Sequence, residues 1–405
     1  MQLWQEMERE GMEEIIFCHD AASGLRAVIA IHSTALGPAL GGCRYWTYAS
    51  EEEAVRDAVK LAKGMTYKNA ISGLPYGGGK VVIWNVPFVK NAKPDEDGCG
   101  SQSAEQVAGD LGVEQQQKGV ATEREVVADE VADRIDIILD TDVCRRAQRF
   151  RALGRCLERL NGRYVTGLDL GTTATDMDQI QLETAHVTDT TGSLGAQDDF
   201  TAEMTAYGVH IGIVTSLRQQ GIASLQGILV AVQGLGKVGY ALCRYLHAAG
   251  ARLIVADVVP DRVQRALVQF SGAIPADPAH IHAADCKVFA PCALGGVLTP
   301  ATVEELRCSI VAGAANNQLS ERQLVAGRMQ ARGILYAPDY VLGAGGIIST
   351  AYELEGAGPD LIRQKVAGIA GTLSKVYAEA AQSAISTADA ADRLAESILR
   401  LGYKK

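Results

Sequence analysis

Apolar and polar residues follow two different spacings over the first eighty positions of the chain. Residues 14 to 32 form two apolar-rich runs separated by the turn-forming segment DAASG, which predicts two strands. Further along, Ser50 and Glu53 have the spacing of a capping box, and apolar residues then recur at helical spacing. The predicted buried stripe consists of Ala54, Val55, Ala58, Val59 and Ala62. We therefore expect a helix that carries the segment GMTYK at its C-terminal end.

From about residue 208 the pattern changes to short β-rich runs separated by helical segments, which is typical of a doubly wound α/β domain. The apolar run 228–232 predicts a strand, and a helical stripe begins at Ala241. Between them lies a GxGxxG loop, which allows a pyrophosphate to approach the start of a helix. The loop residues are Gly234, Leu235, Gly236, Lys237, Val238 and Gly239. Together these features predict a dinucleotide site.

The second strand of this unit, RLIVAD, ends at Asp257, which lies 23 residues after Gly234. A carboxylate at this place can accept a hydrogen bond from an adenosine ribose hydroxyl, and this favours NAD over NADP. Arg262 is close in sequence and keeps NADP open as an alternative.

The composition narrows the class of protein. A chain of 405 residues suggests two domains, and 47% hydrophobic with 21% charged residues is ordinary for a soluble protein. No apolar run reaches the roughly 18 residues of a membrane helix, and the acidic N-terminus does not have the pattern of a secretory signal. The nine cysteines are scattered without metal-ligand spacing, so we expect no metal and a cytoplasmic location. A net charge of −10 argues against a general nucleic-acid binder.

Most of that negative charge is concentrated between Phe88 and Asp142, a segment that contains fourteen Asp and Glu but only five Lys and Arg. The segment begins with a polar, turn-rich stretch and continues with apolar residues at helical spacing. We interpret 88–142 as an acidic insertion, with a flexible loop and one amphipathic helix, in an otherwise regular chain.

The stretch SGLPYGGGKVV contains three consecutive glycines followed by Lys80. A nucleotide phosphate loop would need a glycine at the position of Leu74 and Ser or Thr at the position of Val81, so the spacing does not match. A surface turn with a solvated lysine is the ordinary alternative. Because the helix after Ser50 carries Lys68 near its end, Lys68 and Lys80 are candidates to meet in one cleft.

At this point the chain resembles the amino-acid dehydrogenase family that includes the leucine, valine and phenylalanine dehydrogenases. The resemblance spans nearly the whole chain outside the acidic segment. It rests on LGPALGGCRYW (36–46), GMTYKNA (64–70), GLPYGGGKVVI (73–83), LNGRYVTGLDLGTTATDMD (160–178), MTAYGV (204–209), the dinucleotide loop, APCALGG (290–296), AGAANNQL (312–319) and APDYVLGAGG (337–346).

The resemblance implies an α/β fold in which an N-terminal substrate domain faces a C-terminal Rossmann-type NAD-binding domain. We place the substrate domain at 1–188, the NAD-binding domain at 189–384, and a segment that returns to the first domain at 385–405. The implied reaction is the reversible, NAD-dependent oxidative deamination of an L-amino acid to a 2-oxo acid and ammonia. Relatives are commonly oligomeric, so we expect a homo-oligomer.

The same resemblance assigns roles to three charged residues. Lys80 corresponds to the lysine that activates water, Lys68 to the lysine that holds the substrate carboxylate, and Asp169 to the acid that contacts the substrate amine. A lysine serves as a base only if its pKa lies well below about 10.4, and burial beside a second ammonium has this effect. Outside the family motifs, either lysine would be interpreted as a solvated residue and Asp169 as the cap of a turn.

The remaining contacts are also implied by the resemblance. The substrate-side residues are Leu40, Gly41, Gly42, Gly167, Val366 and Ile369, and the nicotinamide-side residues are Thr205 and Asn317. We interpret Cys292 as a packed thiol, since the reaction needs no nucleophile. Gly343 stands where the family normally has Asn, which indicates weaker substrate binding.

The substrate is predicted only as a class. Leu40, Val366 and Ile369 are apolar, which favours an aliphatic or aromatic amino acid. At position 167 leucine- and valine-type relatives usually carry Ala and aromatic-type relatives Gly, whereas the neighbouring motifs are leucine-type, so we favour a branched-chain substrate over phenylalanine or tryptophan. Two further classes stay open, namely a glutamate dehydrogenase and an NAD-binding homologue with impaired catalysis. The matched motifs contain no extra cation for a glutamate side chain.

Overall fold

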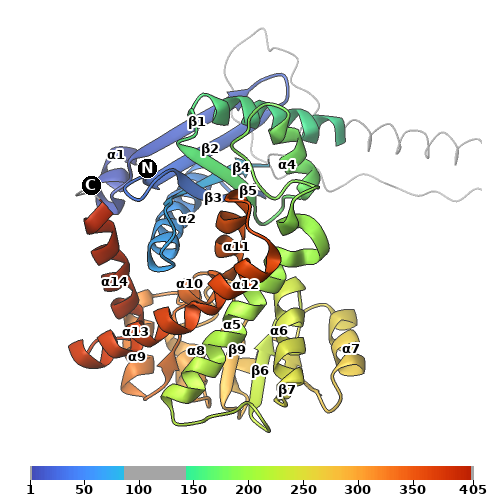
Figure 1. The fold of residues 1–405 in the computed structure, drawn as a ribbon, viewed down its shortest axis with the longest axis vertical. Helices are drawn as coiled ribbons and strands as arrows, with labels where there is room; N and C mark the ends of the chain where they lie inside the picture. The colour runs from blue at the N-terminus through green and yellow to red at the C-terminus, as the bar shows by residue number, and fades with distance from the viewer. Residues whose placement is uncertain (1, 86–142, 403–405) are drawn as a thin grey trace, which may run out of the picture.

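The computed structural model describes residues 2–85 and 143–402 and divides them between two sheets (Figure 1). The acidic segment predicted at 88–142 lies outside the described residues. The first half contains the strands β1 (Glu14–Asp20), β2 (Leu25–Ser33), β3 (Ala39–Trp46), β4 (Gly77–Trp84) and β5 (Tyr164–Leu168), and the helices α1 (Leu3–Glu10), α2 (Glu51–Ile71), one over 143–158, and α4 (Ala174–Gln181).

The first sheet has the order β1-β2-β4-β3-β5, with β1, β2 and β4 antiparallel and β3 parallel to both of its neighbours. The two strands predicted between residues 14 and 32 are observed as β1 and β2. The predicted stripe of α2 is buried against one face of this sheet, and the helix over 143–158 covers the other. Ser50 caps α2 by accepting from the Glu53 backbone N–H, whereas the Glu53 carboxylate accepts from the backbone N–H of Ala49.

The three glycines before Lys80 form the start of β4 and are buried. A Cβ on Gly77 would overlap the carbonyl of Ser33, and one on Gly78 would overlap the backbone of Thr66 in α2. A Cβ on Gly79 would lie 2.7 Å from the Tyr164 ring. The glycines therefore bring β4, and with it Lys80, close to the neighbouring backbone and to α2. This packing, and not the binding of a phosphate, accounts for the run.

The second sheet is parallel throughout, with the order β11-β10-β9-β6-β7-β8. This order corresponds to that of a Rossmann-type dinucleotide domain. Its strands are β6 (Leu229–Gln233), β7 (Arg252–Ala256), β8 (Ile274–Pro275), β9 (Val288–Pro291), β10 (Ile310–Val311) and β11 (Leu335–Tyr336). Its helices are η1 (Leu194–Asp199), α5 (Phe200–Gln219), α6 (Lys237–Ala248), α7 (Pro260–Gln269), η2 (Ile281–Ala283), α8 (Pro300–Glu305) and α9 (Arg322–Ala331). The strands predicted before and after the glycine loop are β6 and β7.

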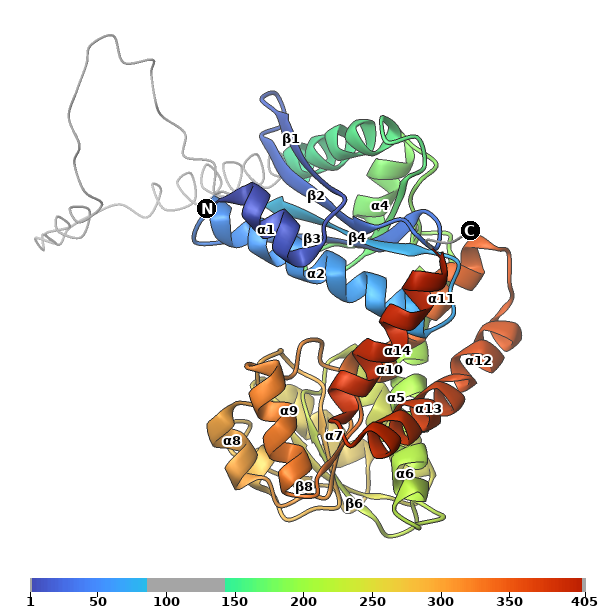
Figure 2. The ribbon, with the colours of Figure 1, turned by 90° about the vertical axis from the view of Figure 1, so that its left-hand side faces the viewer.

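The C-terminal helices lie between and beside the two sheets (Figure 2). They are α10 (Asp339–Leu342), α11 (Gly345–Leu354), α12 (Pro359–Ala367), α13 (Ile369–Ser383) and α14 (Thr387–Gly402). Helix α14 packs against α2, and Tyr67 of α2 donates a hydrogen bond to Glu396 at 3.1 Å. On the same helix, Asp392 forms an ion pair with Arg322 of α9 at 2.7 Å. Helix α14 therefore links the two halves.

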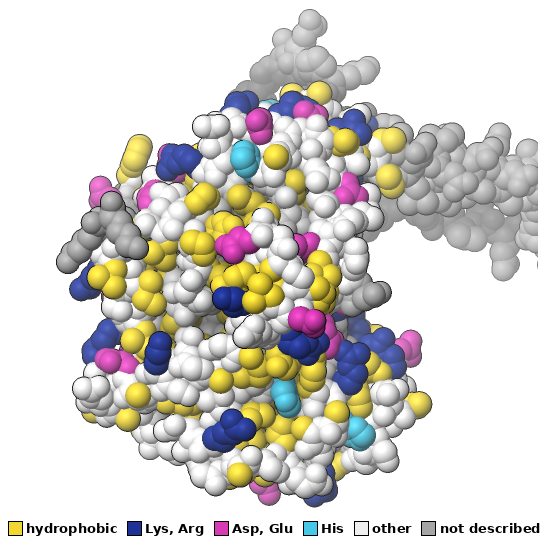
Figure 3. Space-filling model, in the orientation of Figure 1, with side chains coloured by type: hydrophobic (Ala, Val, Ile, Leu, Met, Phe, Trp, Pro, Cys, Tyr) yellow, Lys and Arg dark blue, Asp and Glu magenta, His cyan; other side chains and the backbone are white. Residues whose placement is uncertain are grey.

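On the face of the molecule shown in Figure 3, hydrophobic side chains gather across the middle, and charged side chains of both signs lie around them. Within 2–85 and 143–402, the structure contains no helix of the length and apolar character that crossing a membrane requires.

Candidate active site

A cavity of about 610 Å³ lies between the two sheets. It is lined from the first half by α2, β3, β4 and β5, and from the second half by α5, the start of α6 and the segments around residues 316 and 346. The residues predicted from the sequence that line it are Leu40, Gly41, Gly42, Lys68, Lys80, Gly167, Asp169, Thr205, Val238, Asn317 and Gly343. Residues from motifs far apart in the sequence therefore meet at one place.

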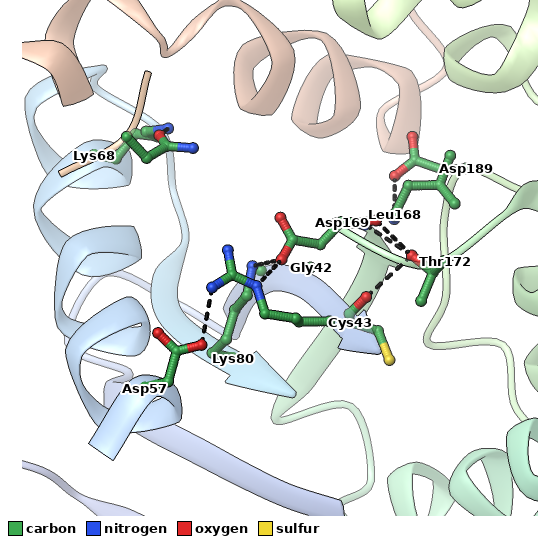
Figure 4. Close-up of polar contacts among 12 residues, drawn as sticks. Gly42, Cys43, Asp57, Lys68, Lys80, Leu168, Asp169, Thr172 and Asp189 are labelled. Carbon is green, nitrogen blue, oxygen red and sulfur yellow. Dashed lines mark hydrogen bonds and ion pairs between the residues drawn. The ribbon is translucent and has the colours of Figure 1, made fainter. Parts of the chain in front are cut away.

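Lys80 and Asp169 form an ion pair in this cavity, with 2.9 Å between the Lys80 Nζ and the Asp169 Oδ2 (Figure 4). Lys80 is buried within β4, and Asp169 follows β5 directly. Arg44 of β3 donates from Nε to the same oxygen at 3.0 Å and from Nη1 to Asp57 at 2.8 Å. Burial raises the pKa of Asp169, but the charges of Lys80 and Arg44 outweigh it and hold this pKa below its ordinary value. Asp169 is therefore ionised at neutral pH.

Lys68 lies on the last turn of α2, across the cavity from that pair. Its Nζ donates to the side-chain oxygen of Asn316 at 3.2 Å and to the carbonyl of Gly343 at 3.4 Å. Burial lowers the pKa of Lys68, Asp339 opposes this change, and the charge of Lys80 adds to it. Two ammonium groups thus face one cavity, which suits the binding of a carboxylate.

The glycines of β3 allow backbone atoms to form part of the cavity wall. A Cβ on Gly41 would overlap the carbonyl of Gly79, and a Cβ on Gly42 would lie 2.8 Å from the Asp169 side chain. The hydroxyl of Tyr164 donates to the Gly41 carbonyl at 2.8 Å. Both glycines are therefore required by the close packing around Lys80 and Asp169.

The wall around Gly167 differs from the expected apolar surface. Leu40 and Ile347 line the cavity, but so do Thr188 and Asp189. Val366 and Ile369 do not line it; they are buried with Leu40 in an apolar cluster behind the wall. The wall predicted from Leu40, Gly167, Val366 and Ile369 thus also contains Thr188 and Asp189, and this segment, which lies outside the motifs of the family resemblance, supplies a carboxyl group.

The glycine loop after β6 has the features of a dinucleotide site. Gly234 has a φ of 95°, and a Cβ on Gly239 would overlap the Gly234 carbonyl. Around Gly236 a Cβ would meet nothing within 4 Å, so the backbone is open to a phosphate there. Helix α6 begins at Lys237 without a side-chain cap, which leaves its first N–H groups for an anion. These residues fit the pyrophosphate of NAD.

Asp257 lies just after β7 and accepts hydrogen bonds from the backbone N–H groups of Leu235, at 2.6 Å, and Val259, at 2.9 Å. Its carboxylate is thereby held next to the glycine loop, with lone pairs left for ribose hydroxyls. Arg262 approaches the same carboxylate at 3.5 Å. The positive charge of an arginine paired with this acid is partly neutralised, which is consistent with a preference for NAD over NADP.

On the nicotinamide side, Thr205 donates to the Thr201 carbonyl at 2.9 Å, and Asn317 has a φ of 52°. Both line the cavity, but it is the neighbouring Asn316 whose side chain contacts Lys68. Burial raises the pKa of Cys292 to about 12, so this residue is a packed thiol. Within the described part of the chain, no group of three or more His, Cys, Asp or Glu is arranged to hold a metal ion.

The polar cavity residues that the sequence prediction missed include Arg44, Asn316 and Asp189. Arg44 lies inside a family motif, and its charge was an available signal. Asn316 adjoins the residue that was chosen in its place. Asp189 gave no signal, because its position beside Gly167 depends on a backbone φ of 59° that the sequence does not specify.

Comparison with known proteins gives consistent matches. Residues 12–116 match the model of the Glu/Leu/Phe/Val dehydrogenase dimerisation domain, and residues 195–258 and 261–398 match that of the Glutamate/Leucine/Phenylalanine/Valine dehydrogenase domain. The leucine dehydrogenase of Thermoactinomyces intermedius is 41% identical over 406 residues, an alignment that covers 100% of this chain and 95% of that enzyme. The valine dehydrogenase of Streptomyces albus is 38% identical, over 96% of this chain and 92% of that enzyme.

Among solved structures, the crystal structure of L-tryptophan dehydrogenase from Nostoc punctiforme superposes with a TM-score of 0.74. The two chains are 34% identical, and the superposition covers 99% of this chain and 100% of the other. The relatives thus share the fold and differ in the amino acid after which they are named.

Proposed function

The chain belongs to the Glu/Leu/Phe/Val dehydrogenase family and is an NAD-dependent oxidoreductase that acts on amino acids, and from this premise we propose that it deaminates a branched-chain L-amino acid, with leucine as the first candidate. The products are the 2-oxo acid and ammonia, and the reaction is reversible. The observation that carries the proposal is the Lys80–Asp169 ion pair in the cavity that Lys68 also lines.

NAD, when bound, accepts a hydride from the substrate Cα. The chain itself has to bind the substrate and move protons. Lys68, held by Asn316 and the Gly343 carbonyl, presents its ammonium to the substrate carboxylate. Asp169 has one oxygen paired with Lys80 and Arg44, which leaves its other oxygen for the substrate amine. In its neutral form, Lys80 accepts a proton from the water that attacks Cα, and its hydrogen bond to Asp169 gives this proton a path out of the buried site.

The glycine loop would hold the cofactor. We assign the pyrophosphate to Gly234, Gly236 and the first N–H groups of α6, and the adenosine ribose to Asp257. Thr205 and Asn317 both line the cavity, and we assign the nicotinamide contacts to them.

The second candidate is an aromatic substrate. Gly167 is the residue that the family resemblance associates with aromatic substrates, and the relative from Nostoc punctiforme is an L-tryptophan dehydrogenase. The leucine- and valine-named relatives favour the branched-chain substrate. A missing or added methyl in an apolar wall changes the discrimination between substrates by only about 1–3 kcal/mol, so residue 167 alone does not decide between them.

The test is to mix the purified protein with NAD or NADP and each of a panel of L-amino acids, and to follow the absorbance of the reduced cofactor. We expect turnover with NAD and the highest kcat/KM for leucine, valine or isoleucine. The highest value for tryptophan or phenylalanine would support the second candidate, and the highest for glutamate would contradict both. NAD binding by calorimetry without turnover on any amino acid would indicate an impaired homologue.

We also propose a homo-oligomer located in the cytoplasm. The match to a dimerisation domain supports self-association, and the described cysteines form no disulfides with one another, which is consistent with a reducing compartment. Light scattering coupled to gel filtration gives the mass of the assembly.

A further inference from the structure

Asp189 occupies an unusual place in the cavity wall. It is only 3% exposed, and its φ of 59° lies in the left-handed region that favours glycine. Its carboxyl group lies between two glycines, Gly167 of β5 and Gly195 of η1. A Cβ on Gly167 would overlap the Asp189 Oδ2, and a Cβ on Gly195 would lie 2.5 Å from its Oδ1. The carboxyl group thus fills the space in which side chains of both positions would lie.

One oxygen of Asp189 supports the backbone next to the candidate catalytic acid. Oδ2 accepts a hydrogen bond from the Leu168 N–H at 3.0 Å, and Leu168 directly precedes Asp169 (Figure 4). Oδ1 is buried and has no hydrogen-bond partner among the described residues. A buried acceptor without a partner is costly, so its retention calls for an explanation.

Burial, together with one neighbouring carboxylate, makes a charge on Asp189 unfavourable. Burial raises its pKa to about 6, and the charge of Glu353 on α11 adds to this rise, whereas the Leu168 N–H and the Thr350 hydroxyl oppose it. Glu353 is fixed by the backbone N–H groups of Leu194, with which it makes a short hydrogen bond, and of Gly195, at 2.9 Å. Among the cavity-lining groups, the charged ones on or directly after the neighbouring strands are Arg44, Lys80 and Asp169, and both cations pair with the Asp169 carboxylate.

We propose that Asp189 is a specificity-determining and positioning residue: its carboxyl group forms the part of the substrate wall assigned to residue 167, and it fixes the backbone that presents Asp169. This inference rests on the proposed function. A carboxylate in the wall penalises an aliphatic side chain, which offers it no donor, more than the indole of tryptophan, which carries an N–H. Asp189 therefore lowers the preference for leucine relative to tryptophan.

The steric part of the inference is tested by a double-mutant cycle of Gly167→Ala and Asp189→Gly. Glycine is chosen at 189 because it tolerates the positive φ, whereas alanine would add strain. Gly167→Ala alone should lower Tm and reduce kcat/KM for leucine and tryptophan at least tenfold, because the methyl displaces the carboxyl group. In the double variant, the Gly167→Ala change should cause no further loss relative to Asp189→Gly alone. Effects of Gly167→Ala that are equal in both backgrounds would overturn the coupling.

The electrostatic part is tested with Asp189→Asn, which keeps the size, the positive φ and an acceptor for the Leu168 N–H but removes the charge. The measured quantity is kcat/KM of wild type divided by that of the variant, for leucine and for tryptophan, between pH 5 and 9. For leucine we expect this ratio to be near one at pH 5 and to fall about threefold or more as pH rises through 6, mainly through KM. For tryptophan it should change less. A pH-independent ratio, or an equal change for both substrates, would overturn the inference.

These outcomes are separable from failure of the proposed function. If wild type oxidises neither amino acid, the proposed function fails, while the Tm cycle still reports on the Gly167–Asp189 contact. If wild type is active, but Gly167→Ala has equal effects with and without Asp189→Gly and the Asp189→Asn ratio does not change with pH, only the inference about Asp189 fails.

Discussion

Replacing Lys80 by alanine is the most direct perturbation of the proposed chemistry. The substitution removes an ammonium that lies 2.9 Å from Asp169 and is almost fully buried. A positioned acid or base contributes about 10²–10⁴ to the rate, or roughly 3–5 kcal/mol of transition-state stabilisation. We therefore expect kcat for leucine to fall by about 10²–10⁴. The affinity for NAD should be unchanged, because the glycine loop lies on the other sheet.

The effect on stability follows from what remains around Asp169. Breaking a buried ion pair costs about 3–5 kcal/mol when the remaining charge is left alone. Here Asp169 keeps Arg44 at 3.0 Å and its side chain is 21% exposed, so we expect a loss of roughly 1–3 kcal/mol. Since this leaves the variant folded at 25 °C, a loss of activity would be due to the missing amine.

The assay follows NADH absorbance under saturating leucine, with NAD affinity from calorimetry and Tm from thermal melts. Lys375→Ala, which removes an exposed lysine of α13, controls for the change in net charge. Adding a small primary amine such as ethylamine to the Lys80→Ala variant should restore part of kcat, because the truncation leaves room for it. Without added amine, Lys80→Ala should show far less than a tenth of wild-type kcat. If it keeps more than about a tenth, Lys80 is not the base.

Three further substitutions test the neighbouring residues. Lys68→Ala should raise KM for leucine at least tenfold with a smaller change in kcat, because a carboxylate anchor contributes binding; a fall in kcat alone would contradict this role. Gly343→Asn should lower KM, since a Cβ there would lie 3.7 Å from the Lys68 Nζ and the added amide could share its task; an unchanged or higher KM would argue against it. Arg44→Met tests the lowered pKa of Asp169. The Arg44–Asp169 pair stabilises the fold above the unfolded pKa of about 3.9, and this stability is lost as pH falls through the lower folded pKa. The fall in Tm from pH 7 to 3 should therefore be smaller in the variant than in wild type.

Local patterns were enough to predict the elements that carry the site. The stripe from Ala54 to Ala62 and the strand, loop and helix around Gly234 are set by neighbours in the sequence, and both were observed. The family motifs then identified Lys68, Lys80 and Asp169, which the fold brings to one cavity.

The contacts that could not be predicted depend on tertiary structure. Arg44 meets Asp169 across 125 positions of sequence, and Asp189 reaches the backbone of Leu168 only because a residue other than glycine adopts a positive φ. Val366 was expected in the pocket wall and lies behind it, since periodicity indicates that a residue is buried but not against which neighbour. A polar wall residue outside every motif therefore has to be found in the structure.

The packing of glycines in β3 and β4 also determines how the cavity can be redesigned. At Gly41, Gly77 and Gly78 any Cβ would overlap backbone atoms, so a saturation library at these codons would return mostly unfolded clones. Gly64 lines the same cavity, and a Cβ there would meet nothing within 4 Å. Directed evolution of the substrate range should therefore diversify Gly64 and the side chains of the wall, and leave the glycine strands unchanged as a rigid template.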